Sequence, residues 1–165
     1  LTTHNIQSYV EHTIGKLRGV AGISYINQKN TYEGRFFIPN FLSNAIGVYV
    51  TEAYTFSKKT KIEAGLRYDY KTLQSYYYEN GILKTPYRTF QSPTASLGVS
   101  HELGKNYTLL STVGTAYRPP NVNELYSYGV HHGAAAYEIG NPNLKPEQSV
   151  NASVTLNYFF KKCFG

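Results

Sequence analysis

Two adjacent histidines, His131 and His132, are the residues of this sequence best suited to hold a metal. Neutral imidazole binds zinc, copper and haem iron. Tyr128 and Glu138 lie close by in the sequence and could add oxygen ligands. The alternative is that the two histidines are merely exposed and polar, as loop residues often are, and the residues alone leave both interpretations open.

Motifs for catalysis are missing from the sequence. It has no Gly-x-Ser-x-Gly, no phosphate-binding glycine loop and no His-Glu-x-x-His, since His101-Glu102 is not followed by a second histidine at that spacing. A single cysteine, Cys163, excludes a disulfide scaffold and a four-cysteine zinc site. His4 and His12, like His101, have no chemical context and are interpreted as strand or turn residues. We therefore do not expect an enzyme.

The composition limits the class of protein. The 165 residues have room for one ordinary domain, and with 17 Tyr and 8 Phe the chain is too aromatic for disorder. No run of about 18 apolar residues predicts a transmembrane helix, and the N-terminus lacks the pattern of a signal peptide. The net charge is +6, but the cations are scattered, with Lys58-Lys59 and Lys161-Lys162 the only adjacent pairs. This scatter argues against nucleic-acid binding.

Apolar and polar residues alternate with a period of two along most of the chain, which indicates strands. From Lys61 to Tyr70 one face is apolar or aromatic and the other is Lys, Glu, Gly, Arg and Asp. The same alternation returns from Ser149 to Phe160. No window of comparable length has a helical period. The sequence predicts seven strands, near residues 2–12, 16–28, 42–57, 59–78, 90–103, 106–118 and 147–160.

The connections between these strands alternate between short and long. Residues 13–15, 57–59 and 104–105 are short links, whereas 29–41, 79–89 and 119–146 are long. Outer-membrane barrels have short periplasmic turns and long outer loops, with lipid on the apolar face and a polar interior. Tyrosine-rich strand ends, such as Tyr76 to Tyr78, suit aromatic girdles or loop packing. We therefore expect an all-β, antiparallel transmembrane β-barrel, with a soluble β-sandwich as the weaker alternative.

Seven strands cannot close a bacterial barrel, because such barrels have even strand numbers. One alternative is a complete small eight-stranded outer-membrane barrel with an adhesin or structural role, in which one strand has escaped detection. The other is that residues 1–165 are a partial β-barrel domain, about seven strands of a larger barrel. The absence of a signal sequence favours the second.

The segment from Ala116 to Glu147 is the most specific part of the sequence. It begins Ala-Tyr-Arg-Pro-Pro-Asn-Val-Asn-Glu-Leu-Tyr and ends Asn-Pro-Asn-Leu-Lys-Pro-Glu. Pro119-Pro120 cannot donate to a ladder and must end a strand, and Asn141-Pro142 starts a turn. Arg118 and Glu147 then fall at facing ends of two consecutive strands. We expect an ion pair there that holds the mouth of the loop, in preference to a ligand contact.

This segment closely resembles the barrel of TonB-dependent outer-membrane receptors, in which a Tyr-Arg-Pro-Pro-like motif precedes Glu-Leu-Tyr and the next strand opens with Asn-Pro-Asn-Leu-Lys-Pro-Glu. Leu66-Arg67-Tyr68-Asp69 is similar to a recurring strand of the same family. The resemblance covers roughly residues 42–160. It implies a plugged barrel of the 22-stranded type in the outer membrane of a Gram-negative bacterium, with the plug and the remaining strands outside this chain.

The resemblance also implies a function. Such a receptor imports a metal or metal chelate (ferric siderophore, haem or zinc) as its transported ligand and holds no resident cofactor. Its partners are the TonB energy-coupling complex, reached through the plug, and outer-membrane lipid and lipopolysaccharide. Haem receptors carry a ligating histidine at the spacing of His131-His132, and zinc-uptake receptors have a similar Glu-Leu-Tyr…His…Glu-Ile-Gly loop. Loop cations favour anionic chelates or lipopolysaccharide, namely Lys29, Arg35, Lys84 and Arg88.

Overall fold

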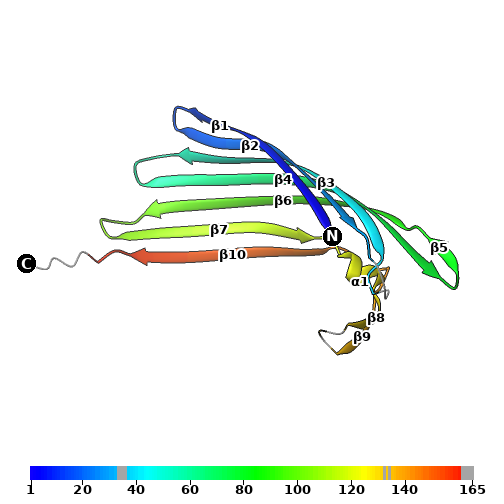
Figure 1. Cartoon of the computed structure of the whole chain (residues 1–165). Helices are drawn as coiled ribbons and strands as arrows, with labels where there is room; N and C mark the ends of the chain where they lie inside the picture. Colours follow the sequence, from blue (N-terminus) through cyan, green and yellow to red (C-terminus); the bar gives the residue numbers. More distant parts are fainter. Residues whose placement is uncertain (33–36, 132, 134, 161–165) are drawn as a thin grey trace, which may run out of the picture.

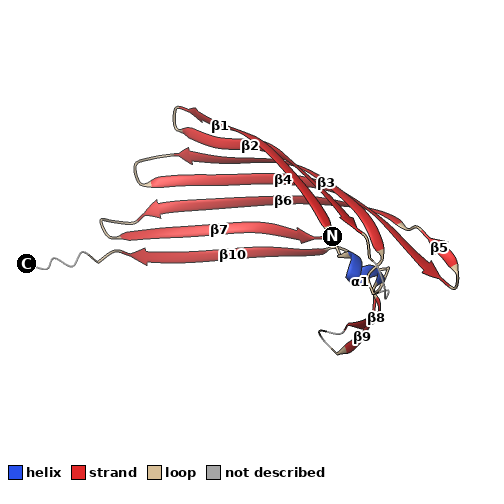
Figure 2. Cartoon of the chain, viewed as in Figure 1, coloured by secondary structure: helices blue, strands red, loops and turns tan. Residues whose placement is uncertain are grey.

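One large antiparallel sheet makes up most of the molecule (Figure 1; Figure 2). The computed structural model describes residues 1–32, 37–131, 133 and 135–160. The long strands lie side by side in chain order, apart from a short β5 (Ile82–Lys84) that pairs with β4. They are β1 (Thr2–Ile14), β2 (Leu17–Asn30), β3 (Asn40–Thr55), β4 (Thr60–Glu79), β6 (Tyr87–Glu102), β7 (Tyr107–Arg118) and β10 (Glu147–Tyr158). The seven predicted strands are confirmed, with ends that differ by a few residues.

The long connections contain structure that the sequence interpretation treated as loop. Residues 79–89 form a hairpin of β4 with β5, turning at Asn80 and Gly81, which both have positive φ (51° and 77°). Asn-Gly is the usual pair for such a turn and is a local signal for this hairpin. The last long connection holds a one-turn helix, α1 (Val122–Tyr126), and a hairpin of β8 (Tyr128–His131) with β9 (Ala136–Ile139).

The two ends of the sheet differ as expected. The short turns all lie at one end, on the left of Figure 1, while β5, α1, β8 and β9 all lie at the other. Below, these are called the turn end and the loop end. No helix among the described residues is both long and apolar enough to cross a bilayer.

The outward face of the sheet is apolar and uncovered. Val154 and Leu156 of β10 are 74% and 58% exposed, and their row continues across the strands through Val113, Leu97 and Leu66. No second sheet packs on this face among the described residues. A compact β-sandwich would bury these side chains, so that alternative is wrong.

The inward face is polar. The Arg67 guanidinium donates two 2.6 Å hydrogen bonds to Asp69 and one of 3.0 Å to Ser24, and it lies 5.5 Å from the ring centre of Tyr49. The hydroxyl of Tyr49 accepts a 2.6 Å bond from Gln7. These hydrogen bonds link β1 to β4. The side chains lie directly over Gly22 and Gly47, where an added Cβ would come within 3 Å of Tyr49 and of Arg67 and Asp69, respectively. This face suits water, not a dry core.

The sheet is open in the described chain. β1 and β10 form its two edges and do not pair with one another. A closed eight-stranded barrel is therefore not the architecture seen. Unpaired edge groups are costly in lipid, so both edges require neighbouring strands when the sheet lies in a membrane.

Candidate functional site: the 119–146 connection at the loop end

The connection between β7 and β10 folds back over the inward face of the sheet. β7 ends at Arg118, because neither Pro119 nor Pro120 can donate to a ladder. Asn121 then caps α1, and the Glu124 carboxylate accepts a 2.7 Å hydrogen bond from the Asn121 N–H. This Asn-x-x-Glu spacing is that of a capping box, a local signal for α1, which was not among the predicted elements.

Arg118 joins three elements at the start of this connection. Its guanidinium donates two 2.9 Å hydrogen bonds to Glu147 of β10, so the expected contact between these strand ends is present. It also donates two 3.0 Å bonds to Glu124 of α1, a partner that the sequence analysis missed. The bond from the Asn121 N–H and the nearby Arg118 both lower the pKa of Glu124 below its usual range. Arg118 therefore ties α1 to the mouth of the β7–β10 hairpin.

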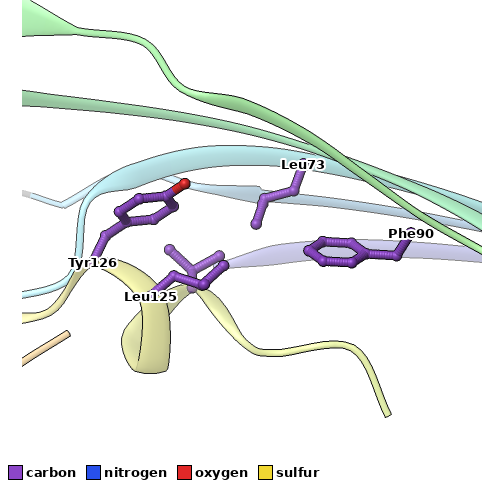
Figure 3. Close-up of a cluster of buried hydrophobic side chains, with 5 residues drawn as sticks. Leu73, Phe90, Leu125 and Tyr126 are labelled. Carbon is purple, nitrogen blue, oxygen red and sulfur yellow. The ribbon is translucent and has the colours of Figure 1, made fainter. Parts of the chain in front are cut away.

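A small hydrophobic cluster seats α1 on the sheet (Figure 3). Leu125 is 0% exposed and packs with Tyr126 and Val122 of the same helix against Leu73 of β4 and Phe90 of β6. These are the buried hydrophobic residues of the described chain. The connection is thus a packed lid over the inward face, not a free loop.

Gly140 fixes the return of the chain past α1. Its N–H donates a 2.7 Å bond to the Ser127 carbonyl, and the Asn141 N–H donates a 2.8 Å bond to the Glu124 carbonyl. A Cβ at Gly140 would lie 2.5 Å from the backbone of Leu125 and Tyr126. Only glycine allows this approach. Nothing in the local sequence marks Gly140, because its contact joins backbones that are distant in the chain.

The Asn141-Pro142 pair forms the predicted turn. The Asn141 side-chain oxygen accepts a 2.9 Å bond from the Asn143 N–H, and its carbonyl accepts a 3.3 Å bond from the Leu144 N–H. The Arg88 guanidinium of β6 donates to the Pro142 carbonyl. This turn leads the chain from α1 to the start of β10.

The β8–β9 hairpin carries the candidate metal ligands. Tyr128 pairs with Ile139, Gly129 with Glu138, and His131 with Ala136. Side chains alternate along a strand, so Tyr128 and Glu138 lie on opposite faces of the hairpin. The pairing thus separates the two candidate oxygen ligands by face, and their role at a metal stays a prediction. The Tyr128 ring instead packs edge-on against Tyr137, with centroids 5.7 Å apart, and their hydrogen bond raises the pKa of Tyr137.

The metal site itself stays a prediction. The backbone of His131 ends β8, while His132, like Arg35, lies outside the described residues. Within the described residues, no three His, Cys, Asp or Glu side chains gather as a metal site would require. The other histidines sit in strands, as expected. His12 contacts Glu52 at 3.1 Å and His101 contacts Thr60 at 2.9 Å.

The geometry agrees with similarity to known proteins. The sequence profile described as TonB dependent receptor-like, beta-barrel matches residues 3–163. The chain belongs to this family. Its members are receptor barrels, so the apolar outward face is the lipid-facing surface of a TonB-dependent receptor barrel, and the polar inward face lines its interior.

Sequence relatives of this TonB-dependent receptor barrel include the Heme/hemopexin utilization protein C of Haemophilus influenzae. It is 25% identical over 182 residues, in strain 86-028NP as in strain Rd. The match covers 99% of this chain and 24% of the relative, so the chain spans about a quarter of the length of these proteins.

Solved structures show the same fold. The copper transporter OprC superposes with a TM-score of 0.75 at 16% identity, covering 97% of this chain and 28% of that one. A double mutant of the Serratia marcescens hemophore receptor HasR, in complex with its hemophore HasA and heme, superposes with a TM-score of 0.71 at 20% identity. There the match covers 94% of this chain and 29% of HasR.

Proposed function

We propose that this chain is part of the wall of an outer-membrane receptor that binds a metal chelate at the cell surface and imports it into the periplasm. The TonB complex supplies the energy, reached through a plug that the receptor carries elsewhere in its sequence. The observation that carries the proposal is the division of the sheet into an uncovered apolar face and a polar inward face, with the 119–146 connection folded over the inward face at the loop end.

Haem is the ligand that we favour over zinc or a ferric siderophore. The sequence relatives at 25% identity are named for haem utilisation. The imidazole of His131 or His132 is a suitable axial ligand for haem iron, and the two residues follow one another in the sequence after Val130. The hairpin follows directly from α1, which is anchored by Arg118 and by the hydrophobic cluster, so the ligand would bind on a positioned support.

Haem and zinc binding by the intact receptor test the ligand assignment. We expect the His131→Ala, His132→Ala double variant to lose haem affinity by at least tenfold and to lose the Soret shift of a histidine-ligated haem. His4→Ala, in β1 and remote in sequence from the hairpin, is the matched control and should bind as the wild type does. Unchanged affinity for both haem and zinc in the double variant would remove the site assignment and leave the family membership untouched.

Uptake requires a separate test. Cells that depend on the intact receptor should grow with haem as the only iron source, and deletion of TonB should abolish this growth. Growth that persists without TonB would contradict the proposed mechanism. Growth on a siderophore or on zinc, with no response to haem, would replace the ligand.

A further inference from the structure

A hollow of about 430 Å³ lies at the loop end, where the β8–β9 hairpin leaves α1 (Figure 1). One side of it is well packed. Leu125 and Tyr126 of α1 are 0% and 8% exposed, and Tyr77 of β4 packs against the same hydrophobic cluster. The ring centres of Tyr77 and Tyr126 lie 5.6 Å apart, with 34° between the ring planes. This side of the hollow therefore carries two aromatic rings that the fold holds in place.

The base of the hairpin forms another side of the hollow. Tyr128 of β8 pairs with Ile139 of β9, so their side chains share one face of the hairpin, and both residues line the hollow. The Tyr128 N–H donates a 3.1 Å hydrogen bond to the Phe37 carbonyl, which fixes the start of β8. Tyr128 thus borders the hollow from a strand that is tied down at its base, and it is the third tyrosine ring at one space.

The apolar side chains on the hairpin side are exposed. Tyr128 is 59% exposed and Ile139 is 69% exposed. Lipid accounts for the exposed apolar face of the large sheet, but the hairpin is a separate two-stranded sheet at the loop end, on the connection that folds over the inward face. Lipid therefore does not account for its exposed apolar groups. An exposed apolar surface beside a hollow is typical of a binding site.

The hollow carries little charge. Among the described residues that line it, Glu79 alone is charged, and its carboxylate lies 3.8 Å from the Lys84 ammonium. Tyrosine offers a broad, stiff ring, so it contacts flat apolar groups at a small cost in conformational entropy. Of the three candidate ligands, a zinc ion has no apolar surface, and a ferric siderophore surrounds its iron with polar donors. A porphyrin presents the widest flat apolar surface of the three.

We propose that this hollow binds the conjugated ring of a porphyrin against the aromatic rings of Tyr77, Tyr126 and Tyr128. Tyr128 acts through its ring and makes no bond to the iron. Recognition of the ring is then separate from ligation of the iron by His131 or His132. The inference rests on the proposed function, because it names the part of haem that the loop end recognises besides the metal.

Binding of metal-free protoporphyrin IX to the intact receptor in detergent, followed by the fluorescence of the compound, tests the proposal. The wild type should bind it within tenfold of its affinity for haem. Tyr128→Leu removes the aromatic ring and should weaken the binding of both compounds at least tenfold. The control is Tyr87→Leu, which should bind as the wild type does, because Tyr87 is also 59% exposed but does not line the hollow. His131→Ala, His132→Ala should lose affinity for haem alone.

Two further variants separate the ring of Tyr128 from its other possible roles. Tyr128→Phe keeps the ring without the phenol oxygen and should bind both compounds more tightly than Tyr128→Leu does. Ile139→Ser removes an apolar contact at an exposed position and should weaken the binding of both compounds severalfold. This second variant carries the test if Tyr128→Leu does not fold.

Binding of haem by the wild type without any binding of the metal-free ring would overturn the proposal and leave the proposed function intact. Equal affinities in the wild type, Tyr128→Leu and Ile139→Ser would overturn it too. Loss of haem binding alone in Tyr128→Phe would make the phenolate an iron ligand and contradict the role given to the ring. A wild type that binds neither compound would remove the ligand assignment together with this inference, whereas the dependence of uptake on TonB has its own assay.

Discussion

The turn end and the loop end of the sheet are built on different physical principles. At the turn end, neighbouring strands are fully paired, joined by two to four residues, and bury no hydrophobic cluster among the described residues. At the loop end, β6 and β7 separate, and the inward face is covered by α1 on a small apolar cluster. Both ends have backbone ladders, but only the loop end adds side-chain packing and a few specific contacts to them.

This difference predicts where the protein tolerates amino-acid substitutions. A ladder depends little on side-chain identity, because its bonds come from the backbone. A helix of five residues is too short to be stable alone, so α1 exists only through its contacts with the sheet. Substitutions at the loop end should therefore have much larger effects than matched substitutions at the turn end.

Leu125→Ala should have the largest effect. The side chain is fully buried, and truncation of a buried leucine costs about 2–5 kcal/mol because it leaves a cavity. We expect faster hydrogen exchange across residues 121–126 in the intact receptor. Leu103→Ala, at the turn end and 57% exposed, is the control. Equal exchange in the two variants would contradict the distinction between the ends.

Gly140→Ala should follow, with a cost of about 1–3 kcal/mol from overpacking. The new methyl group has no room beside the backbone of Leu125 and Tyr126. Relief of the clash breaks the bonds from the Gly140 and Asn141 N–H groups to the carbonyls of Ser127 and Glu124. Hydrogen exchange at Gly140 and Asn141 measures this. Gly104→Ala is the control. It lies at a short turn with open space around it and should leave hydrogen exchange at Gly140 and Asn141 unchanged. Unchanged protection at Gly140 would refute the close approach.

Arg118→Gln should loosen the mouth of the connection without unfolding the barrel. The guanidinium bridges Glu124 and Glu147, and glutamine cannot make these bidentate bonds. Exchange in residues 121–126 should quicken by a smaller factor than in Leu125→Ala. Arg18→Gln on the inward face at the turn end is the matched control. An Arg118→Lys variant that behaves as the wild type would show that charge alone suffices.

Acidification should release α1 through Glu124. Because its folded pKa is lowered, the stabilisation is present above the ordinary pKa of about 4.3 and is lost as the pH falls through the lower folded value. Protection factors of α1, corrected for the intrinsic exchange rate, should decrease in that range. Glu124→Gln should have lower protection at neutral pH and little dependence on acid. An identical pH profile in wild type and variant would exclude this carboxylate.

Lys61→Gln should have the smallest effect. The ammonium group lies 3.8 Å from Glu63 at the turn end, and both side chains are exposed. Such pairs contribute little, so the free energy of unfolding should change by less than about 0.5 kcal/mol. Urea unfolding in detergent measures it. A loss comparable to that of Arg118→Gln would show that ion pairs matter equally at both ends.

The strands could be predicted because their signal is local. The alternation of Val154 and Leu156 with Ser153 and Thr155 shows which face of the strand is apolar and meets lipid. The other long strands have a similar alternation, so each can be predicted from its own residues. The alternation of short and long connections needed only the order of the strands. The Arg118–Glu147 contact was also predictable, because both residues end consecutive strands.

The packing of the 119–146 connection and the separation of β6 from β7 could not be predicted in the same way. Asn80-Gly81 and Asn121-x-x-Glu124 are local signals that were present and overlooked. The placement of α1 on Leu73 and Phe90 is different, since it joins residues separated by tens of positions and no periodic pattern encodes such a contact. The opposed faces of Tyr128 and Glu138 likewise required the register of a hairpin whose strands have only four residues each.

The sequence by itself determined the faces, the order of the strands and the family, because period two and the motif around Arg118 depend on neighbouring residues. The tertiary structure alone decided that Gly140 holds a helix and that β6 parts from β7 at Ala95. Both depend on where distant backbones meet, and that is set by the sum of many weak contacts and by no single local preference.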